Sequence, residues 1–278
     1  MIVLKKFIIS PPFGNYIHLD CATSVAGTFT AKRRKGLIRQ AIKTIRPIKG
    51  GWVNKIGFRN KGIKNVTFRN DQIYSVAGLE GDGDWSLICD TLPEDCMVEA
   101  NAGCPNAGSY SISMFALRLF VQKFQTPILK VSPTDGGMLT VCKAYEIGFR
   151  TVHIANTIPV EQGGESGQRL KPISLHMIEE TKRLFPNITV IGGGGIYSPE
   201  DLKDYVLMDL IQKAATEDGK LDFDKLEDKE KDAFAMQEVL VKSYERALGL
   251  KASESNYFAD LSSKGKKITD KYAPAEGN

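Results

Sequence analysis

Short apolar runs alternate with amphipathic segments along most of the chain. Two segments, 111–124 and 173–185, repeat apolar residues at roughly helical spacing and predict helices. Apolar or β-branched runs bounded by Gly, Pro or Asn predict buried strands. The clearest of these runs are 72–78, 96–103, 126–133, 149–157 and 188–193, and further strand candidates are 1–10, 16–20, 27–32 and 209–215.

The order of these elements indicates the fold class. Strands that are apolar almost throughout, separated by helices, are typical of a parallel sheet with helices outside it. About eight such units favour a compact α/β fold, a (β/α)8 TIM barrel, and a doubly wound open sheet is the alternative. We expect residues 1–216 to form the barrel and residues 217–278 to form a charged helical extension, partly flexible towards its end.

Composition places the chain among ordinary globular proteins. Of its 278 residues, 42% are hydrophobic and 25% are charged. We find no apolar run of about 18 residues, so no membrane-spanning helix is expected. The start, MIVLKKFIIS, lacks a signal-peptide pattern and predicts a first strand. These features predict a cytoplasmic protein without a membrane partner.

Charge and cysteine usage narrow the chemistry. Residues 217–278 carry 11 basic and 14 acidic side chains, whereas residues 1–216 carry 26 and 19, a net charge of +7. The basic body suits an anionic ligand, and no continuous basic stripe suggests a nucleic acid. Five cysteines without a CxxC pair indicate a reducing compartment and neither a disulfide framework nor a metal site.

Unusual polar residues recur where the predicted strands end. In a barrel these ends share one rim, and active sites lie there. The residues concerned are Lys32, Asn101, Cys104, Asn106, Lys130, Asn156, Thr157 and the run 192–195. Lys130 would point inward as a fixed cation; alternatively it is a lysine whose amine reaches water.

Two glycine-rich segments are candidate phosphate sites. VIGGGGIYSPEDL passes from a strand through a tight loop into a helix, with Ser198 as N-cap and Pro199 in its first turn. Backbone N–H groups at such a helix start bind phosphate, although a plain glycine-rich turn reads the same way. GGESGQRLKP, at 163–172, is a second such loop. Together they suit a phosphorylated cofactor.

Cys104 is the candidate for proton transfer. It lies between Gly103 and Pro105, and a thiolate there could act as a general base. His18, His153 and His176 lie far from it in the sequence and look structural. A cysteine hydrolase is therefore not favoured.

Six segments resemble the dihydroorotate dehydrogenase family in order and in approximate spacing, over residues 50–215, and the pyrimidine-reducing domain of dihydropyrimidine dehydrogenase has similar ones. They are GGWVNKIGFRNKG, VEANAGCPN, ILKVSP, IANT, GGESGQRLKP and VIGGGGIYSPEDL. The resemblance implies an FMN-binding (β/α)8 barrel that oxidises dihydroorotate to orotate in pyrimidine biosynthesis. It favours the soluble, cysteine-type class, in which a Cys base removes the C5 proton and hydride passes to flavin N5.

The resemblance also implies roles for individual residues. Cys104 matches the base. Substrate binding is implied for Asn54, Asn101, Asn106, Asn156 and Thr157, whose amide and hydroxyl groups suit the donor and acceptor edge of a pyrimidine. Contacts with FMN are implied for Lys32, Lys130, Ser166, Gly167, Gly194, Gly195, Ala214 and Ala215.

The match is divergent in three places, one of which is that residues 217–278 resemble no part of the family. Ala214 and Ala215 stand where the family has a glycine–threonine pair, and the first unit is abbreviated. The electron acceptor stays open between fumarate and a partner flavoprotein that serves nicotinamide, and a homodimer or a partner electron-transfer subunit would suit the family. Two alternatives remain: a tRNA-dihydrouridine synthase-like FMN reductase, which NAGCP would fit, and a catalytically lapsed flavin-binding barrel.

Overall fold

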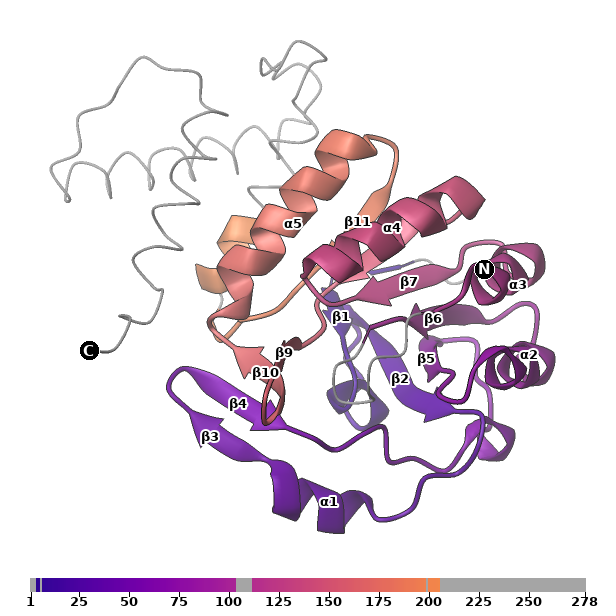
Figure 1. Cartoon of the computed structure of the whole chain (residues 1–278), viewed down its shortest axis with the longest axis horizontal. Helices are drawn as coiled ribbons and strands as arrows, with labels where there is room; N and C mark the ends of the chain where they lie inside the picture. Colours follow the sequence, from indigo (N-terminus) through magenta and orange to yellow (C-terminus); the bar gives the residue numbers. More distant parts are fainter. Residues whose placement is uncertain (1–3, 6, 104–111, 199, 206–278) are drawn as a thin grey trace, which may run out of the picture.

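Seven parallel strands form the main sheet of the protein. The computed structural model describes residues 4–5, 7–103, 112–198 and 200–205. Figure 1 shows the sheet curling, with helices packed on its outer side. Its order is β1 (Phe7–Ile9), β2 (Ala22–Thr30), β5 (Gln72–Ala77), β6 (Met97–Asn101), β7 (Ile128–Val131), β8 (Thr151–Ile154) and β11 (Thr189–Gly192).

Four helices cover the outer face of this sheet. They are α2 (Asp82–Thr91), α3 (Met114–Lys123), α4 (Asp135–Ile147) and α5 (Leu170–Leu184). Because successive side chains in a strand point to opposite faces, each strand contributes to two clusters. In β6, Val98 and Ala100 pack outward into the large core with Leu117 and Phe120 of α3. A second cluster, built on Val25, Ile73 and Ile128, occupies the inner face.

A smaller antiparallel sheet accompanies the main one. Its order is β3 (Arg46–Ile48), β4 (Gly51–Asn54), β10 (Gly163–Gly167) and β9 (Ile158–Val160). Helix α1 (Leu37–Thr44) precedes β3, and the short 3-10 helices η1 (Phe13–Asn15) and η2 (Ile63–Asn65) complete the described elements. β9 follows β8 and β10 leads into α5, so this sheet lies beside the carboxyl ends of the main strands.

The predicted elements are confirmed in outline. The five clearest strand predictions and both helix predictions overlap observed elements, and the fold is an α/β fold with a curled parallel sheet. Within the described residues this sheet is open between β1 and β11, so a closed eight-stranded ring is not seen there. The candidate strand 209–215 and the predicted extension 217–278 lie outside the described residues.

Two local predictions are wrong. Segment 16–20 forms no strand, because Tyr16 ends η1 and most of the segment is solvent-exposed. The glycine segment at 163–167 is a strand, β10, paired on both sides, and not a loop. Its glycines let two backbones approach closely: a Cβ on Gly163 would lie 2.2 Å from the carbonyl oxygen of Asn54.

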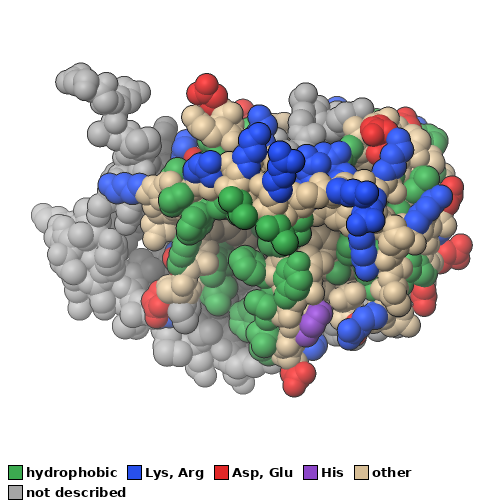
Figure 2. Space-filling model, turned by 90° about the horizontal axis from the view of Figure 1, so that it is seen from below, with side chains coloured by type: hydrophobic (Ala, Val, Ile, Leu, Met, Phe, Trp, Pro, Cys, Tyr) green, Lys and Arg blue, Asp and Glu red, His purple; other side chains and the backbone are tan. Residues whose placement is uncertain are grey.

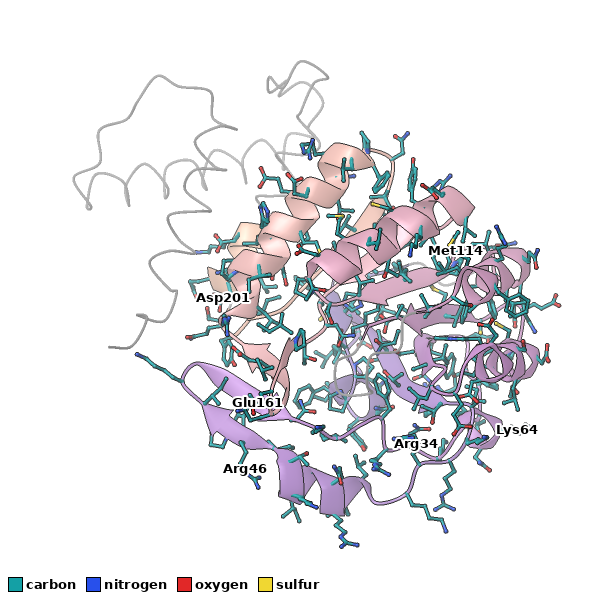
Figure 3. All side chains as sticks on the ribbon, in the orientation of Figure 1. Arg34, Arg46, Lys64, Met114, Glu161 and Asp201 are labelled. Atoms are coloured by element: carbon teal, nitrogen blue, oxygen red, sulfur yellow. The ribbon has the colours of Figure 1, made fainter. Side chains whose placement is uncertain are left out.

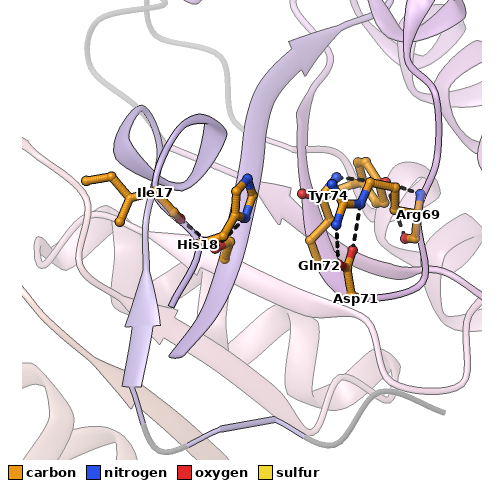
Figure 4. Close-up of polar contacts among 7 residues, drawn as sticks. Ile17, His18, Arg69, Asp71, Gln72 and Tyr74 are labelled. Atoms are coloured by element: carbon orange, nitrogen blue, oxygen red, sulfur yellow. Dashed lines mark hydrogen bonds and ion pairs between the residues drawn. The ribbon is translucent and has the colours of Figure 1, made fainter. Parts of the chain in front are cut away.

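The amino ends of β2 and β5 are held by polar contacts (Figure 4). The hydroxyl of fully buried Tyr74 accepts a hydrogen bond from Nε2 of Gln72 at 2.9 Å and donates to the carbonyl of Arg69 at 3.3 Å. Nδ1 of His18 lies 3.1 Å from Oγ of Ser24. This end of a parallel sheet usually serves stability, which agrees with the structural role expected for His18.

Strand β2 is irregular towards its carboxyl end. The register with β5 shifts between Ala26 and Phe29, and a Cβ on Gly27 would lie 2.4 Å from the carbonyl oxygen of Ser75. Asn15 satisfies the freed backbone: its Oδ1 accepts from the Gly27 N–H at 2.8 Å, and its Nδ2 donates to the Gly27 carbonyl at 2.7 Å. Such bulges redirect neighbouring side chains.

Candidate active site

The inner face of the main sheet changes from apolar to polar along the strands. Glu99 follows Met97 by two residues and Lys130 follows Ile128 by two, so each pair shares the inner face. In register, Ser75 pairs with Glu99, and Lys130 pairs with His153. Ser75, Glu99, Lys130 and His153 form what we call the polar layer, and none is more than 5% exposed.

Three ionisable groups of the polar layer are in contact. Nδ1 of His153 lies 2.6 Å from Oε2 of Glu99, and Nζ of Lys130 lies 3.8 Å from Oε1 of the same carboxylate. Burial alone would raise the pKa of Glu99, but the Lys130 ammonium and the His153 contact outweigh it and lower the pKa to about 2. Glu99 is therefore a carboxylate at neutral pH.

The protonation state of His153 follows from the same contacts. Burial, with the Lys130 ammonium adding to it, lowers the pKa of His153 below its ordinary value despite the opposing effect of Glu99. The imidazole is thus neutral at pH 7. Since a carboxylate can accept but not donate, Nδ1 carries the ring proton and Nε2 does not.

A relay of hydrogen bonds crosses the strand ends next to the polar layer. Oγ1 of Thr28 lies 3.0 Å from Oγ of Ser75 and accepts from Nδ2 of Asn101 at 3.0 Å. Nδ2 of Asn156 donates to Oδ1 of Asn101 at 2.8 Å, and the Thr157 N–H donates to Oδ1 of Asn156 at 3.0 Å. Three predicted substrate-binding residues therefore lie together.

Thr157, the last residue of this relay, also carries a buried hydroxyl. Among the described residues, buried Oγ1 of Thr157 has no hydrogen-bond partner. A buried hydroxyl without a partner costs about 1–3 kcal/mol. A polar substrate that bonded Thr157 would remove that cost.

The chain that leads to Cys104 reaches the same rim. The Ala102 N–H donates to the carbonyl of Lys130 at 2.8 Å, and Oγ of Ser132 donates to the carbonyl of Gly103 at 2.5 Å. Cys104 and Asn106 themselves lie outside the described residues, as do Ala214 and Ala215.

The two glycine segments predicted to bind phosphate touch one another. A Cβ on Gly195 would lie 2.9 Å from the carbonyl oxygen of Gly167, and Gly167, Gly194 and Gly195 have φ of +145°, +106° and +67°. These values favour glycine. The structure thus brings Ser166 and Gly167 together with Gly194 and Gly195.

The start of the helix after this turn is already capped. The N–H groups of Tyr197 and Ser198 donate to Oδ2 of Asp201 at 2.9 and 3.0 Å, and Lys171 lies 2.8 Å from Oδ1 (Asp201 is labelled in Figure 3). The Asp201 N–H donates to Oγ of Ser198 at 3.4 Å, as the predicted N-cap requires. The carboxylate takes the anion position at this helix start, so the turn at Gly194 and Gly195 is the part that can receive a phosphate.

FMN fits these residues. Gly167, Gly194 and Gly195, which we call the glycine cradle, lie together at positive φ without side chains, and backbone of this kind can bind a phosphate through its N–H groups. Gly193 connects the cradle to the strand ends, because its N–H donates to the carbonyl of Ile154 at 3.1 Å. The buried Lys130 supplies a cation in the polar layer. These residues would hold the phosphate and the ring system respectively.

Two predicted residues lie apart from the polar layer. Lys32 follows the end of β2, its side chain is 70% exposed, and its amine forms an ion pair with Glu80. Asn54 ends β4 in the small sheet, where it pairs with Gly164. Asn54 therefore borders the rim, whereas Lys32 lies on the surface.

Sequence reasoning missed four residues of the site. Glu99 and His153 are central to it, and Thr28 and Ser75 extend the relay. The signal was present in β6, where Glu99 interrupts the apolar run of a buried strand. A charged residue in such a strand needs a partner. Because side chains alternate between the two faces of a strand, that partner could have been sought on the same face of a neighbouring strand.

One face of the protein is strongly basic. Residues 21–70 hold 13 Lys and Arg and no Asp or Glu. Figure 2 shows Lys and Arg side chains in a row along one face, beside a group of hydrophobic ones, and Figure 3 places Arg34 and Arg46 along this margin of the fold. Such a field attracts anionic ligands.

No helix in the described part of the chain is long and apolar enough to cross a membrane.

The fold and the site together define a class: an α/β protein with a curled parallel sheet and a ligand site at the carboxyl ends of its strands. No protein-family model matches the chain. Curated relatives do, and they share one description, the catalytic subunit of dihydroorotate dehydrogenase B (NAD(+)).

The similarity to these relatives is moderate but extends over much of the chain. The protein from Trichlorobacter lovleyi is 28% identical over 234 residues, which cover 70% of this chain and 75% of the relative. The Porphyromonas gingivalis protein is 26% identical, and the match covers 70% of this chain and 74% of the relative. The Listeria innocua protein is 28% identical, and the match covers 56% of this chain and 63% of the relative. The chain is thus similar, at 26–28% identity, to the catalytic subunits of dihydroorotate dehydrogenase B.

Proposed function

We propose that this protein oxidises dihydroorotate to orotate with FMN as its cofactor. The observation that carries the proposal is the convergence of Lys130, Asn101, Asn156 and Thr157 at the strand ends next to the glycine cradle. The names of the relatives support the same reaction. FMN, when bound, supplies the hydride acceptor.

The residues of the chain then divide the remaining work. The ring edge of the substrate is bound through paired hydrogen-bond donors and acceptors. These are the Thr157 hydroxyl and the carboxamides of Asn54, Asn101, Asn106 and Asn156. Cys104 removes the C5 proton as general base. Lys130 provides fixed positive charge near the cofactor.

Phosphate binding falls to backbone groups. Ser166, Gly167, Gly194 and Gly195 form the touching glycine segments, and the backbone of Ala214 and Ala215 completes the set by family resemblance. Lys32 is the weakest assignment of the group, because its amine already has an acidic partner at the surface. We place the protein in the cytoplasm as a biosynthetic enzyme that transfers its electrons to an acceptor or a partner subunit.

Anaerobic flavin reduction tests the proposal. Protein loaded with FMN should lose its flavin absorbance when dihydroorotate is added without oxygen. Cys104→Ser should slow this loss strongly at neutral pH and move the optimum upward, because a hydroxyl is a much weaker acid than a thiol. Cys21→Ser is the matched control, because Cys21 is an exposed free cysteine near the amino end of β2.

Three other results would reject parts of the proposal. An unchanged rate in Cys104→Ser would remove that residue as the base. Bound flavin that dihydroorotate never bleaches would indicate a lapsed enzyme. Reduced flavin that is reoxidised by uridine in tRNA, with formation of dihydrouridine, and tRNA binding that weakens steeply with salt would favour the synthase instead.

A further inference from the structure

The carboxylate of Glu99 is only partly satisfied although it is buried. Oε2 receives the hydrogen bond from His153 at 2.6 Å, whereas Oε1 has no hydrogen-bond partner among the described residues. The nearest cation, Nζ of Lys130, is 3.8 Å away, which is too far for a hydrogen bond. Lys130 and Glu99 therefore compensate each other's charge without sharing a proton donor.

A direct Glu99–Lys130 bond would normally be favoured. Buried ion pairs gain most when the charged groups also form hydrogen bonds, and both groups lie on the inner face of neighbouring strands. His153 opposes that closure, because the 2.6 Å hydrogen bond from its Nδ1–H to Oε2 fixes the orientation of the carboxylate. In the register of the sheet, Lys130 on β7 pairs with Asn101 on β6 and with His153 on β8, and Glu99 precedes Asn101 by two residues on the same face of β6.

We infer that His153 is a positioning residue that holds Glu99 away from Lys130 and so leaves the Lys130 ammonium free to donate to an electron-rich ligand. The ligand named here, FMN, rests on the proposed function. His153 does not touch the reacting atoms in this scheme. It acts through Glu99, and the lysine keeps both a nearby counter-charge and unused N–H donors.

The first test concerns the imidazole itself and needs neither FMN nor dihydroorotate. Nitrogen-15 NMR of histidine-labelled protein at pH 7 should show one ring protonated at Nδ1 and bare at Nε2. His153→Asn assigns the signal by removing it. A ring that carries no proton on Nδ1 would overturn the inference.

The second test measures FMN affinity and reduction potential in substituted proteins. His153→Leu removes the donor, and we expect FMN to bind about tenfold or more weakly, with a more negative potential, because Glu99 then occupies Lys130. His153→Asn keeps an amide donor near the position of Nδ1 and should restore affinity to within about threefold. Equal losses in both variants would contradict a positioning role.

A double-mutant cycle separates positioning from general loss of packing. In the Glu99→Gln background, His153→Leu should change FMN affinity by less than about twofold, because its effect passes through the carboxylate. Additive losses would show a merely structural role. Should leucine prevent folding, the NMR measurement and His153→Asn still decide. A positive result here with no bleaching by dihydroorotate would reject the proposed reaction but not the role of His153.

Discussion

Nδ2 of Asn156 donates a hydrogen bond to Oδ1 of Asn101 across 2.8 Å, although the two residues are 55 positions apart in the chain. The bond joins the end of β6 to the segment after β8. Asn101 also donates to Thr28 on β2. One side chain thus connects three parts of the rim that the strands alone would hold only by backbone contacts.

Replacing Asn101 should therefore destabilise the protein. Asn101→Ala leaves the amide of Asn156 without its buried acceptor and removes one of the two partners of the Thr28 hydroxyl, and we expect a loss of about 1–3 kcal/mol in the free energy of unfolding. Urea denaturation measures it. Asn65→Ala is the control, because Asn65 is exposed and bonds a carbonyl four residues away. Equal effects of the two substitutions would refute the importance of the relay.

The buried imidazole predicts an acid-sensitive stability. The pKa of His153 is lowered in the folded protein, so the unfolded chain binds a proton below about pH 6.5 that the folded chain refuses. Stability should therefore fall as the pH drops from about 7 to 5. In His153→Asn this part of the decline should be smaller. Denaturation midpoints at several pH values check this, and parallel curves for the two proteins would contradict it.

Glu99 adds a second acid-dependent term at lower pH. Its folded pKa of about 2 lies below the ordinary value, so its contribution is fully present above about pH 4.5 and is lost as the pH falls towards 2. Glu99→Gln should lower stability at pH 7, because Lys130 loses its counter-charge, and should flatten the decline below pH 4.5. The measurement is again the free energy of unfolding against pH. A decline below pH 4.5 as steep as in the unsubstituted protein would exclude Glu99 as its source.

Gly27 should tolerate no side chain. Its φ is +127° and a Cβ would lie 2.4 Å from the Ser75 carbonyl oxygen, so Gly27→Ala should cost more than about 2 kcal/mol and displace Thr28. Gly83→Ala, in α2, meets nothing within 4 Å and should be neutral or stabilise by up to about 1 kcal/mol. Thermal unfolding compares the two. A tolerated Gly27→Ala would exclude the close approach of β2 and β5.

Gly195 offers a test of the phosphate cradle. Gly195→Ala places a methyl 2.9 Å from the Gly167 carbonyl oxygen at a φ of +67°, so FMN affinity should fall by about tenfold or more if this turn holds the phosphate. Gly36→Ala controls for backbone strain, because Gly36 has a φ of +87° but open space around it. It should lower stability without changing FMN binding, as measured by fluorescence titration. Equal FMN affinity in the two variants would exclude the cradle.

The strands of the main sheet and several polar positions at their ends could be predicted from local sequence, because each depends on near neighbours. The apolar runs at β5, β6, β7, β8 and β11 specify buried strands, and Asn101, Lys130 and Asn156 stand out as polar residues at their ends. The strand β10 could not be predicted this way. Its glycines carry no hydrophobic signal, and they form a strand because β4 and β9, which are remote in sequence, supply partners on both sides.

The sequence by itself determined the parallel α/β architecture, because period and turn chemistry are local properties of the chain. Only the tertiary structure decided that His153 forms a hydrogen bond with Glu99, 54 residues away in the chain, beside Lys130. No local sequence rule links the two residues, because each one alone looks like an ordinary residue in a strand. Their protonation states are set by burial and by their mutual contact. The tertiary structure also decided that Lys32 forms an ion pair with Glu80 at the surface whereas Lys130 is buried. Strand register and the curl of the sheet determine how far each amine is buried.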